Sequence, residues 1–309
     1  MKGKILIIDD LHPEFKERAI QAGYEVDDLP QITRAETLAV IGEYTGIAVR
    51  TKFRIDREVM EAGTNLRFIA RAGAGLDNID EAYAAERNIL LMNAPEGNRD
   101  AVGEHATGLL LSLLNHFRRA DTEIRNGIWD REGNRGYELK GKTVGIIGYG
   151  FMGSSFARKL AGFEVNVIAY DKYKTGFSDE YVRECSMEEI VKHSDVLSLH
   201  IPLTAETAQL VNEEYLFHFK KKIFLINTAR GEVVNTTALL AALESGKVIG
   251  AGLDVLEVEK FPKLGEQPWY EALKANKNVI LTPHVGGWTF ESYRKISSVL
   301  ADKLEAASF

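Results

Sequence analysis

The chain has 309 residues, of which 45% are hydrophobic, 38 basic and 45 acidic, proportions that fit about two globular domains and exclude a disordered chain. The net charge of −7 argues against sequence-independent binding to nucleic acid, which needs a basic surface. The single cysteine, Cys185, excludes an internal disulfide framework and a cysteine-based zinc cluster, so no metal is expected. Without a signal-peptide pattern or an apolar run of membrane-spanning length, a cytoplasmic protein that binds no membrane is expected.

The first hundred residues alternate short apolar runs with helical stretches. Residues 13–23 have apolar side chains at helical spacing and end at Gly23, which predicts a helix. Continuous apolar runs separated by helical segments are typical of a parallel sheet covered on both faces. The runs that predict strands here are 4–9, 46–50, 67–73 and 89–93.

A long helix with an apolar stripe is predicted over residues 98–124, with Asn98 as its N-cap. The Gly- and Asn-rich residues 126–141 are predicted to form a connection. Residues 289–309 predict one further helix, which is too short to form a domain and must pack onto one already built.

The second half of the chain repeats the alternation on a larger scale, which predicts a second doubly wound α/β unit. Its six predicted strands are 143–148, 165–171, 195–201, 223–228, 249–255 and 279–284. We therefore expect an α/β protein of two parallel-sheet domains. A flavodoxin-like substrate domain is expected from 1–97 and 287–309, and a Rossmann dinucleotide-binding domain from 98–286.

Three glycines, Gly148, Gly150 and Gly153, form a G-x-G-x-x-G motif. The motif alone is weak, but a predicted strand precedes it and a predicted helix over 153–161 follows it. In such a turn the first glycine permits the tight bend and the second lets the backbone approach a diphosphate. The third glycine lets helix and strand pack closely. The helix N-terminus then offers N–H groups to the anion.

Asp171 ends the next predicted strand, 18 residues after Gly153. A carboxylate about 20 residues beyond the motif binds the adenosine ribose hydroxyls and repels a 2′-phosphate. The string therefore predicts NAD as the cofactor. Lys172 and Lys174 follow closely and weaken the discrimination against NADP.

Three later predicted strands end in groups suited to hydride chemistry on a 2-hydroxy acid. That chemistry needs a cation for the carboxylate, an acid–base for the hydroxyl proton, and a group that sets the pKa of the acid–base. Arg230, Asp254 with Glu259, and His284 follow three of the strands. The carboxyl ends of parallel strands are where ligands bind in doubly wound sheets.

Seven strings resemble, in order, those of the D-isomer-specific 2-hydroxy acid dehydrogenases, and among them most closely the 3-phosphoglycerate dehydrogenases. The resemblance extends from residue 71 to residue 287. The strings are RAGAGLDNID (71–80), MNAPEGNRDAVGEH (92–105), the glycine-rich motif, HIPLTAET (200–207), INTARGEVVN (226–235), GLDVLEVE (252–259) and TPHVGG (282–287).

The resemblance implies that His284 is the general acid–base and that Glu259 orients it and raises its pKa. Arg230 would bind the substrate carboxylate and polarise the carbonyl, and Asp254 would lie near the nicotinamide. Glu257 competes with Glu259 as the partner, but the family places the glutamate five residues after the aspartate, which favours Glu259.

The cofactor and substrate residues implied by the resemblance come from both predicted domains. Those for NAD are Gly148, Tyr149, Gly150, Phe151, Met152, Gly153, Asp171, His200, Pro202, Thr207, Thr228, Ala229, Arg230, Asp254, His284 and Gly286. Those for the substrate are Arg54, Arg71, Ala74, Gly75, Arg230 and His284. The cleft between the domains is expected to hold both ligands.

The substrate expected first is D-3-phosphoglycerate, oxidised to 3-phosphohydroxypyruvate in serine biosynthesis, because Arg54 and Arg71 could hold a phosphate. A glyoxylate or hydroxypyruvate reductase is the main alternative. An NAD-sensing corepressor without catalysis is a further one. Glu259 argues against a formate dehydrogenase, which pairs its histidine with glutamine.

Two positions depart from the family pattern: Lys260 stands where a proline is usual, and Trp288 where a small residue is common. Trp288 is expected either to narrow the pocket or to pack at a hinge. No regulatory domain and no serine feedback are expected, because the sequence ends at Phe309. His105 and most other histidines are expected to be structural, and the helix over 98–124 is implied to form a homodimer.

Overall fold

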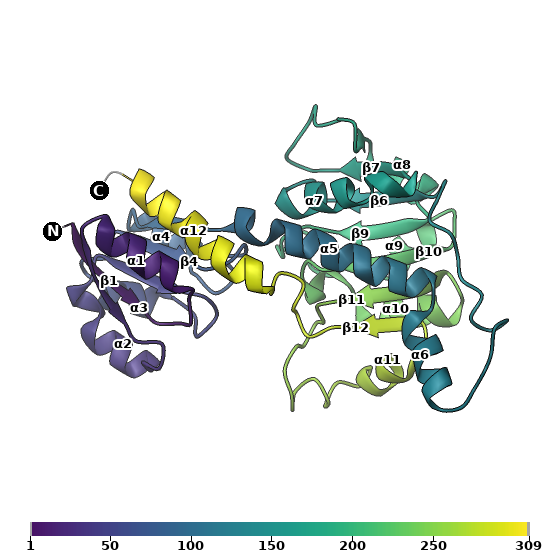
Figure 1. Cartoon of the computed structure of the whole chain (residues 1–309), viewed down its shortest axis with the longest axis horizontal. Coiled ribbons are helices and arrows are strands. Elements are labelled where there is room, and N and C mark those ends of the chain that lie inside the picture. Colours follow the sequence, from purple (N-terminus) through teal and green to yellow (C-terminus); the bar gives the residue numbers. More distant parts are fainter. Residues whose placement is uncertain (1, 308–309) are drawn as a thin grey trace. The chain divides into compact units, whose positions relative to one another are not determined.

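The computed structural model describes residues 2–307. The chain divides into two compact units, Met1–Arg99 with Trp288–Phe309, and Asp100–Gly287. Each unit is built on its own parallel sheet with helices packed on it (Figure 1). No helix within the described residues is long and apolar enough to cross a membrane.

The first unit contains a five-stranded sheet in the order β2-β1-β3-β4-β5, with every pair parallel. This is the flavodoxin-like strand order. The strands are β1 (Gly3–Ile7), β2 (Tyr24–Asp28), β3 (Gly46–Val49), β4 (Phe68–Arg71) and β5 (Leu90–Asn93). The helices are α1 (Pro13–Gln21), α2 (Arg34–Val40), α3 (Arg57–Ala62), α4 (Glu81–Glu86) and α12 (Phe290–Ala306), with a 3₁₀ turn at Ile41–Glu43.

Helix α12 returns the end of the chain to the first unit. Thr289 begins it with a capping box whose partner is Ser292. Arg18 of α1 binds Asp302 and Glu305 of α12, and the apolar face of α12 packs into the core of this unit. The helix predicted over 289–309 is therefore present, although residues 308 and 309 lie outside the described part of the chain.

Among the strands of this unit, β2 is the one that the apolar runs did not predict. Its sequence YEVDD carries three acidic side chains, and only Tyr24 is buried. An edge strand pairs on one side only, so backbone pairing with β1 suffices to hold it without an apolar run.

The second unit has a seven-stranded sheet in the order β12-β11-β10-β9-β6-β7-β8. Its first six strands in chain order reproduce the Rossmann arrangement, and β12 extends the sheet beyond β11. The strands are β6 (Thr143–Ile147), β7 (Asn166–Tyr170), β8 (Arg183–Glu184), β9 (Val196–Leu199), β10 (Ile223–Asn227), β11 (Val248–Leu253) and β12 (Val279–Leu281). The two-residue edge strand β8 was not predicted.

Helices cover both faces of this sheet, and the predicted fold class is confirmed. They are α6 (Phe117–Arg125), α7 (Phe151–Lys159), α8 (Met187–His193), α9 (Glu213–His218), α10 (Thr236–Glu244) and α11 (Tyr270–Ala275), with 3₁₀ turns at Ala161–Phe163 and Gly231–Val233. The boundary between the units falls within α5 (Pro95–Leu114).

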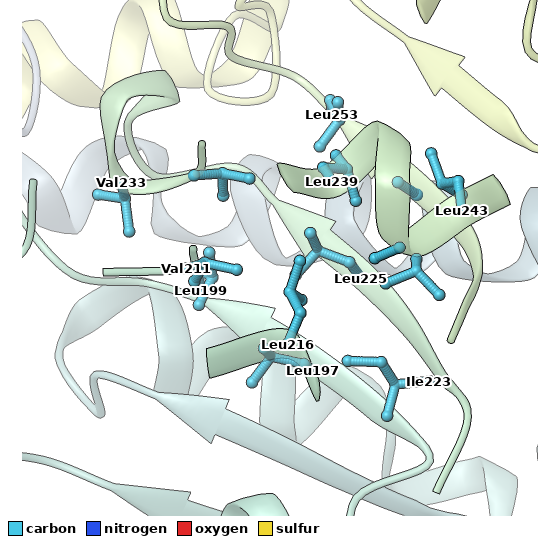
Figure 2. Close-up of a cluster of buried hydrophobic side chains, with 14 of the residues drawn as sticks. Leu197, Leu199, Val211, Leu216, Ile223, Leu225, Val233, Leu239, Leu243 and Leu253 are labelled. Atoms are coloured by element: carbon cyan, nitrogen blue, oxygen red, sulfur yellow. The ribbon is translucent and has the colours of Figure 1, made fainter. Parts of the chain in front are cut away.

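Buried aliphatic side chains pack the strands of this sheet against the helices on one face. Leu197 and Leu225 from neighbouring strands meet Leu216 of α9 and Leu239 of α10 in one cluster (Figure 2). Full burial of each such side chain contributes about 2 kcal/mol. This packing fixes where the carboxyl ends of the strands lie.

The single helix predicted over 98–124 is wrong in two respects. It begins at Pro95, whose fixed φ suits the first helical turn, so Asn98 lies inside the helix and does not cap it. It also ends at Leu114, where Tyr137 N donates to the Leu114 carbonyl and His116 adopts a left-handed φ of 53°. Helix α6 then starts anew, without a buried side chain.

Candidate active site

Three neighbouring strands deliver the chemically active groups to one edge of the sheet. Strand β10 precedes Arg230, β11 precedes Asp254 and β12 precedes His284. Because β10, β11 and β12 are adjacent and parallel, their carboxyl ends lie side by side. The result is a pocket of about 370 Å³, lined by Arg230, Glu232, Glu257, Val258, Glu259, Lys260, Lys263 and His284.

His284 and Glu259 form an ion pair inside this pocket, with 3.0 Å between His284 Nδ1 and the Glu259 carboxylate. The hydrogen bond to Glu259 raises the pKa of His284, and it outweighs burial, which lowers it. The charge of Arg230 acts in the opposite direction and lowers the same pKa. An imidazole with its proton on Nδ1 leaves Nε2 to exchange a proton with a ligand.

Glu257, the competing partner, is committed elsewhere. Its carboxylate accepts from Thr236 N at 2.7 Å and from Gln209 Nε2 at 3.0 Å, at the start of α10. A carboxylate at a helix N-terminus is stabilised by the unpaired N–H groups there. The structure therefore places Glu259, and not Glu257, beside the imidazole.

Arg230 is oriented by the backbone that follows β10. Arg230 Nη1 donates to the Ala229 carbonyl at 2.6 Å, and Asn227 Nδ2 donates to the Arg230 carbonyl at 2.9 Å. Asn227 is fully buried, and its Oδ1 also accepts from Ala229 N at 3.0 Å. These hydrogen bonds fix the backbone of the loop from which the Arg230 guanidinium faces the pocket.

Asp254 is only 3% exposed and binds the chain that carries His284. Its carboxylate accepts from Thr282 Oγ1 at 2.6 Å, Val285 N at 2.9 Å and Gly286 N at 2.8 Å. Burial alone would raise the pKa of Asp254, but hydrogen bonds from His105, Thr282 and the two amides lower it to about 2. The carboxylate is therefore charged at neutral pH.

The glycine-rich turn between β6 and α7 has the shape that a dinucleotide requires. Gly148 has a φ of 91°, and a Cβ there would lie 2.5 Å from the His200 carbonyl oxygen. A Cβ on Gly153 would lie 2.1 Å from the Gly148 carbonyl oxygen, so helix and strand approach too closely for a side chain. A Cβ on Gly150 would meet nothing within 4 Å, so this glycine borders open space at the start of α7. The residues present fit a diphosphate at this helix N-terminus.

Asp171 follows β7 and is tied to the glycine turn, because its carboxylate accepts from Tyr149 N at 2.8 Å. The two lysines that follow it are engaged by this chain's own groups. Lys172 pairs with Glu206, and Lys174 Nζ donates to the Tyr149 carbonyl at 3.1 Å. Both lysines, which weakened the sequence-based discrimination against NADP, thus bind groups of this chain and not a ribose phosphate.

The ends of β9 and β10 leave polar atoms without partners at the same edge of the sheet. His200 Nδ1 and Thr228 Oγ1 are buried and meet no hydrogen-bond partner within the described residues. Burial lowers the pKa of His200 to about 3, so its imidazole is neutral, and its Nε2 contacts Ser198 Oγ at 2.8 Å. Buried polar atoms of this kind need a partner, and a bound dinucleotide would supply one.

The remaining predicted residues lie near these groups or in the first unit. Thr207 orders the loop after β9, with its hydroxyl donating to the Pro202 carbonyl at 2.7 Å. The other four belong to the first unit: Arg54 follows β3, Arg71 ends β4, and Ala74 and Gly75 follow β4. Within that unit Asn93 Nδ2 donates to the Ala74 carbonyl at 2.6 Å.

Trp288 is the first residue after the boundary between the two units, as the expected position at a hinge requires. Its ring lies 3.9 Å from the Arg50 guanidinium carbon and makes an edge contact with Tyr293, all within the first unit. The sequence interpretation also assigned no part in the site to His105 or Thr282, although both reach the Asp254 carboxylate. Their residue types and spacing carry no signal, since they lie 177 positions apart.

A Rossmann sheet with a glycine cradle, and an imidazole–carboxylate pair beside a guanidinium, define a dinucleotide-dependent oxidoreductase. Residues 107–286 match the family described as D-isomer specific 2-hydroxyacid dehydrogenase, NAD binding domain. The chain belongs to this family of NAD-dependent oxidoreductases, which confirms the resemblance and the predicted cofactor.

Individual relatives carry different names. The chain is 38% identical over 275 residues to hydroxypyruvate reductase of Thermotoga maritima, covering 88% of each protein. It is 34% identical to D-3-phosphoglycerate dehydrogenase of Archaeoglobus fulgidus, over 97% of this chain but 56% of that relative, so it spans about half of its length. The crystal structure of a glyoxylate reductase from Paecilomyes thermophila superposes with a TM-score of 0.88 at 29% identity, covering 99% of this chain and 95% of that one.

Proposed function

We propose that His284 is the general acid–base of a D-2-hydroxy acid/2-keto acid interconversion. Glu259 orients its imidazole and Arg230 binds the substrate carboxylate. The observation that carries this proposal is that all three side chains line one pocket. NAD, when bound, supplies the hydride acceptor for oxidation or the donor for reduction.

The residues of the chain divide the remaining work between them. In reduction, His284 as imidazolium donates the proton on Nε2 to the substrate carbonyl oxygen, while the Glu259 side chain accepts from Nδ1–H. In oxidation the neutral imidazole accepts the hydroxyl proton at the same atom. Arg230 offers a planar pair of donors to the carboxylate and thereby fixes which carbon faces the cofactor.

We propose D-3-phosphoglycerate and 3-phosphohydroxypyruvate as the substrate pair, a reaction of serine biosynthesis. Support comes from cations beyond Arg230: Lys260 and Lys263 line the same pocket. By the resemblance to the family, Arg54 and Arg71 would bind the phosphate, and the amides of Ala74 and Gly75 would bind the carboxylate. In this arrangement residues 1–97 and 287–309 serve as the substrate domain, and residues 98–286 as the cofactor domain.

A matrix of initial rates tests the substrate. We expect kcat/KM for 3-phosphohydroxypyruvate to exceed that for hydroxypyruvate and for glyoxylate by at least about tenfold, roughly 1.4 kcal/mol of transition-state binding. Reversing the charge of Arg54 or Arg71 should reduce this ratio and leave the rate with hydroxypyruvate nearly unchanged. If an unphosphorylated keto acid is preferred tenfold, the phosphate assignment is wrong.

A glyoxylate or hydroxypyruvate reductase is the second candidate. The relatives with these names match over most of their own length, whereas the phosphoglycerate dehydrogenase matches over 56% of its length. The same initial-rate matrix separates the two candidates, because they differ only in the group attached beyond the keto carbon.

Two glycines test the cofactor site as a matched pair. Gly150→Ala places a methyl group in open space at a φ of −84°, so the fold should tolerate it, while the methyl occupies room that the diphosphate needs. We expect Tm to change little and the Kd for NADH to rise at least about tenfold, the equivalent of about 1.4 kcal/mol. Gly153→Ala, with its methyl 2.1 Å from the Gly148 carbonyl oxygen, should lower Tm instead. Unchanged NADH affinity in a well-folded Gly150→Ala variant would remove the diphosphate from this turn.

We also propose a cytoplasmic homodimer. Helix α6 and the loop after it expose large apolar side chains, among them Phe117, Ile124, Ile128 and Trp129, the last of them 79% exposed. Several large exposed apolar side chains so close together in the sequence favour an association surface. The mass of the protein in solution, compared with that of a Trp129→Glu variant, tests the assignment.

A further inference from the structure

The backbone that carries His284 is held in an uncommon conformation. His284 has a φ of 55°, in the left-handed region that residues other than glycine seldom adopt. Such a conformation persists only where surrounding contacts impose it. The turn formed by residues 282–286 must therefore be anchored for the imidazole to stay beside Glu259.

Asp254 supplies the first layer of anchors. Its carbonyl oxygen accepts from His284 N at 2.8 Å. Its carboxylate accepts from Val285 N and Gly286 N, the two amides that follow the imidazole. Hydrogen bonds to the buried Asp254 thus hold the backbone at the left-handed residue His284 and at the two residues that follow it.

His105, from α5, supplies a second layer. His105 Nε2 lies 3.0 Å from Thr282 Oγ1 and 3.3 Å from Asp254 Oδ1. Because the Thr282 hydroxyl donates its hydrogen to Asp254, its oxygen is left to accept, which puts a hydrogen on His105 Nε2. A Cβ on Gly286 would lie 2.9 Å from Asp254 Oδ2 and 3.3 Å from His105 Cδ2, so a glycine is needed where the three segments meet.

Packing alone does not account for this histidine. Helix α5 is attached to the sheet by Leu109, Leu110 and Leu113, which are nearly or fully buried, whereas the His105 side chain is 23% exposed. His105 contributes one N–H group, which points at Thr282 Oγ1 and at the Asp254 carboxylate. That N–H joins a helix far away in the sequence to the turn that holds the acid–base.

We propose that His105 is a positioning residue for His284, acting through Thr282 and the Asp254 carboxylate to hold the turn of residues 282–286. The inference rests on the proposed role of His284. Losing the Nε2 donor releases Thr282 and one side of the carboxylate. The turn then relaxes, and the imidazole spends less time in contact with Glu259.

Two amide variants test the directed bond. The amide nitrogen of His105→Gln can occupy the place of Nε2, whereas His105→Asn is shorter and reaches only the place of Nδ1. We expect kcat to fall at least tenfold in His105→Asn and to stay within threefold of wild type in His105→Gln. In His105→Asn, the fall of the keto-acid reduction rate with rising pH should begin at a lower pH. KM for NADH should change less than kcat.

Matched variants separate positioning from loss of stability. Leu110→Ala removes a buried side chain from the same helix and should lower Tm without moving the pH profile. Thr282→Val removes the intermediate hydroxyl, and its effect on kcat should not multiply with that of His105→Asn, because both break one chain of contacts.

Each result of these measurements either supports or contradicts the positioning role of His105. If His105→Gln is as slow as His105→Asn, or if His105→Asn matches Leu110→Ala in both Tm and pH profile, the positioning role is wrong. His284→Ala is measured alongside. Full activity in that variant would overturn the proposed acid–base and this inference together, whereas an inactive His284→Ala with active His105 variants would overturn the inference alone.

Discussion

Replacing His284 by alanine should lower kcat by about 10³, within the range that general acid–base catalysis contributes. The variant loses the imidazole that lines the pocket and whose pKa is raised by its hydrogen bond to Glu259. NADH affinity should change little, because the diphosphate cradle lies at the start of α7. Stopped-flow reduction of a 2-keto acid, with NADH binding measured by fluorescence, checks both expectations.

Glu259→Gln provides the companion measurement, because glutamine keeps the size of the side chain and removes its charge. Glu259 raises the pKa of His284, so the variant should have a lower pKa at that residue. Reduction needs the imidazolium, and its kcat/KM should therefore begin to fall at a lower pH than in the wild type. A pH profile identical to that of the wild type would exclude Glu259 from the mechanism.

Arg230→Ala should raise KM for the keto acid and lower kcat/KM roughly a hundredfold, since two charge-assisted hydrogen bonds are worth about 3 kcal/mol. The charge of Arg230 lowers the pKa of His284, so its removal should raise that pKa. The fall of the reduction rate with pH should consequently begin at a higher pH. Arg230→Ala and Glu259→Gln thus predict shifts of opposite sign.

Arg230→Lys is the control for charge without shape. Lysine keeps the positive charge but not the planar pair of donors, so kcat/KM should remain low while the pH profile returns toward that of the wild type. If lysine restores kcat/KM fully, the residue acts only as a point charge. If alanine leaves KM unchanged, the substrate carboxylate binds elsewhere.

Local patterns predicted most of the fold because the central strands of the two sheets are buried on both faces and are therefore continuous apolar runs. Strands β2 and β8 were not predicted, because an edge strand needs no continuous apolar run. The break between α5 and α6 escaped it as well, since the apolar pattern continues through the region. Helix α5 ends where the Leu114 carbonyl accepts a hydrogen bond from Tyr137 N, a residue that lies beyond α6 in the sequence.

The sequence by itself determined the family, the cofactor and the glycine cradle. The cradle is one contiguous strand–turn–helix segment, so its residues are close in space because they are close in the sequence. Only the tertiary structure decided which glutamate meets the imidazole, and that Asp254 anchors the turn of His284 with help from His105. The order of β10, β11 and β12 brings these side chains together. Strand order follows from long-range pairing, which no local spacing encodes.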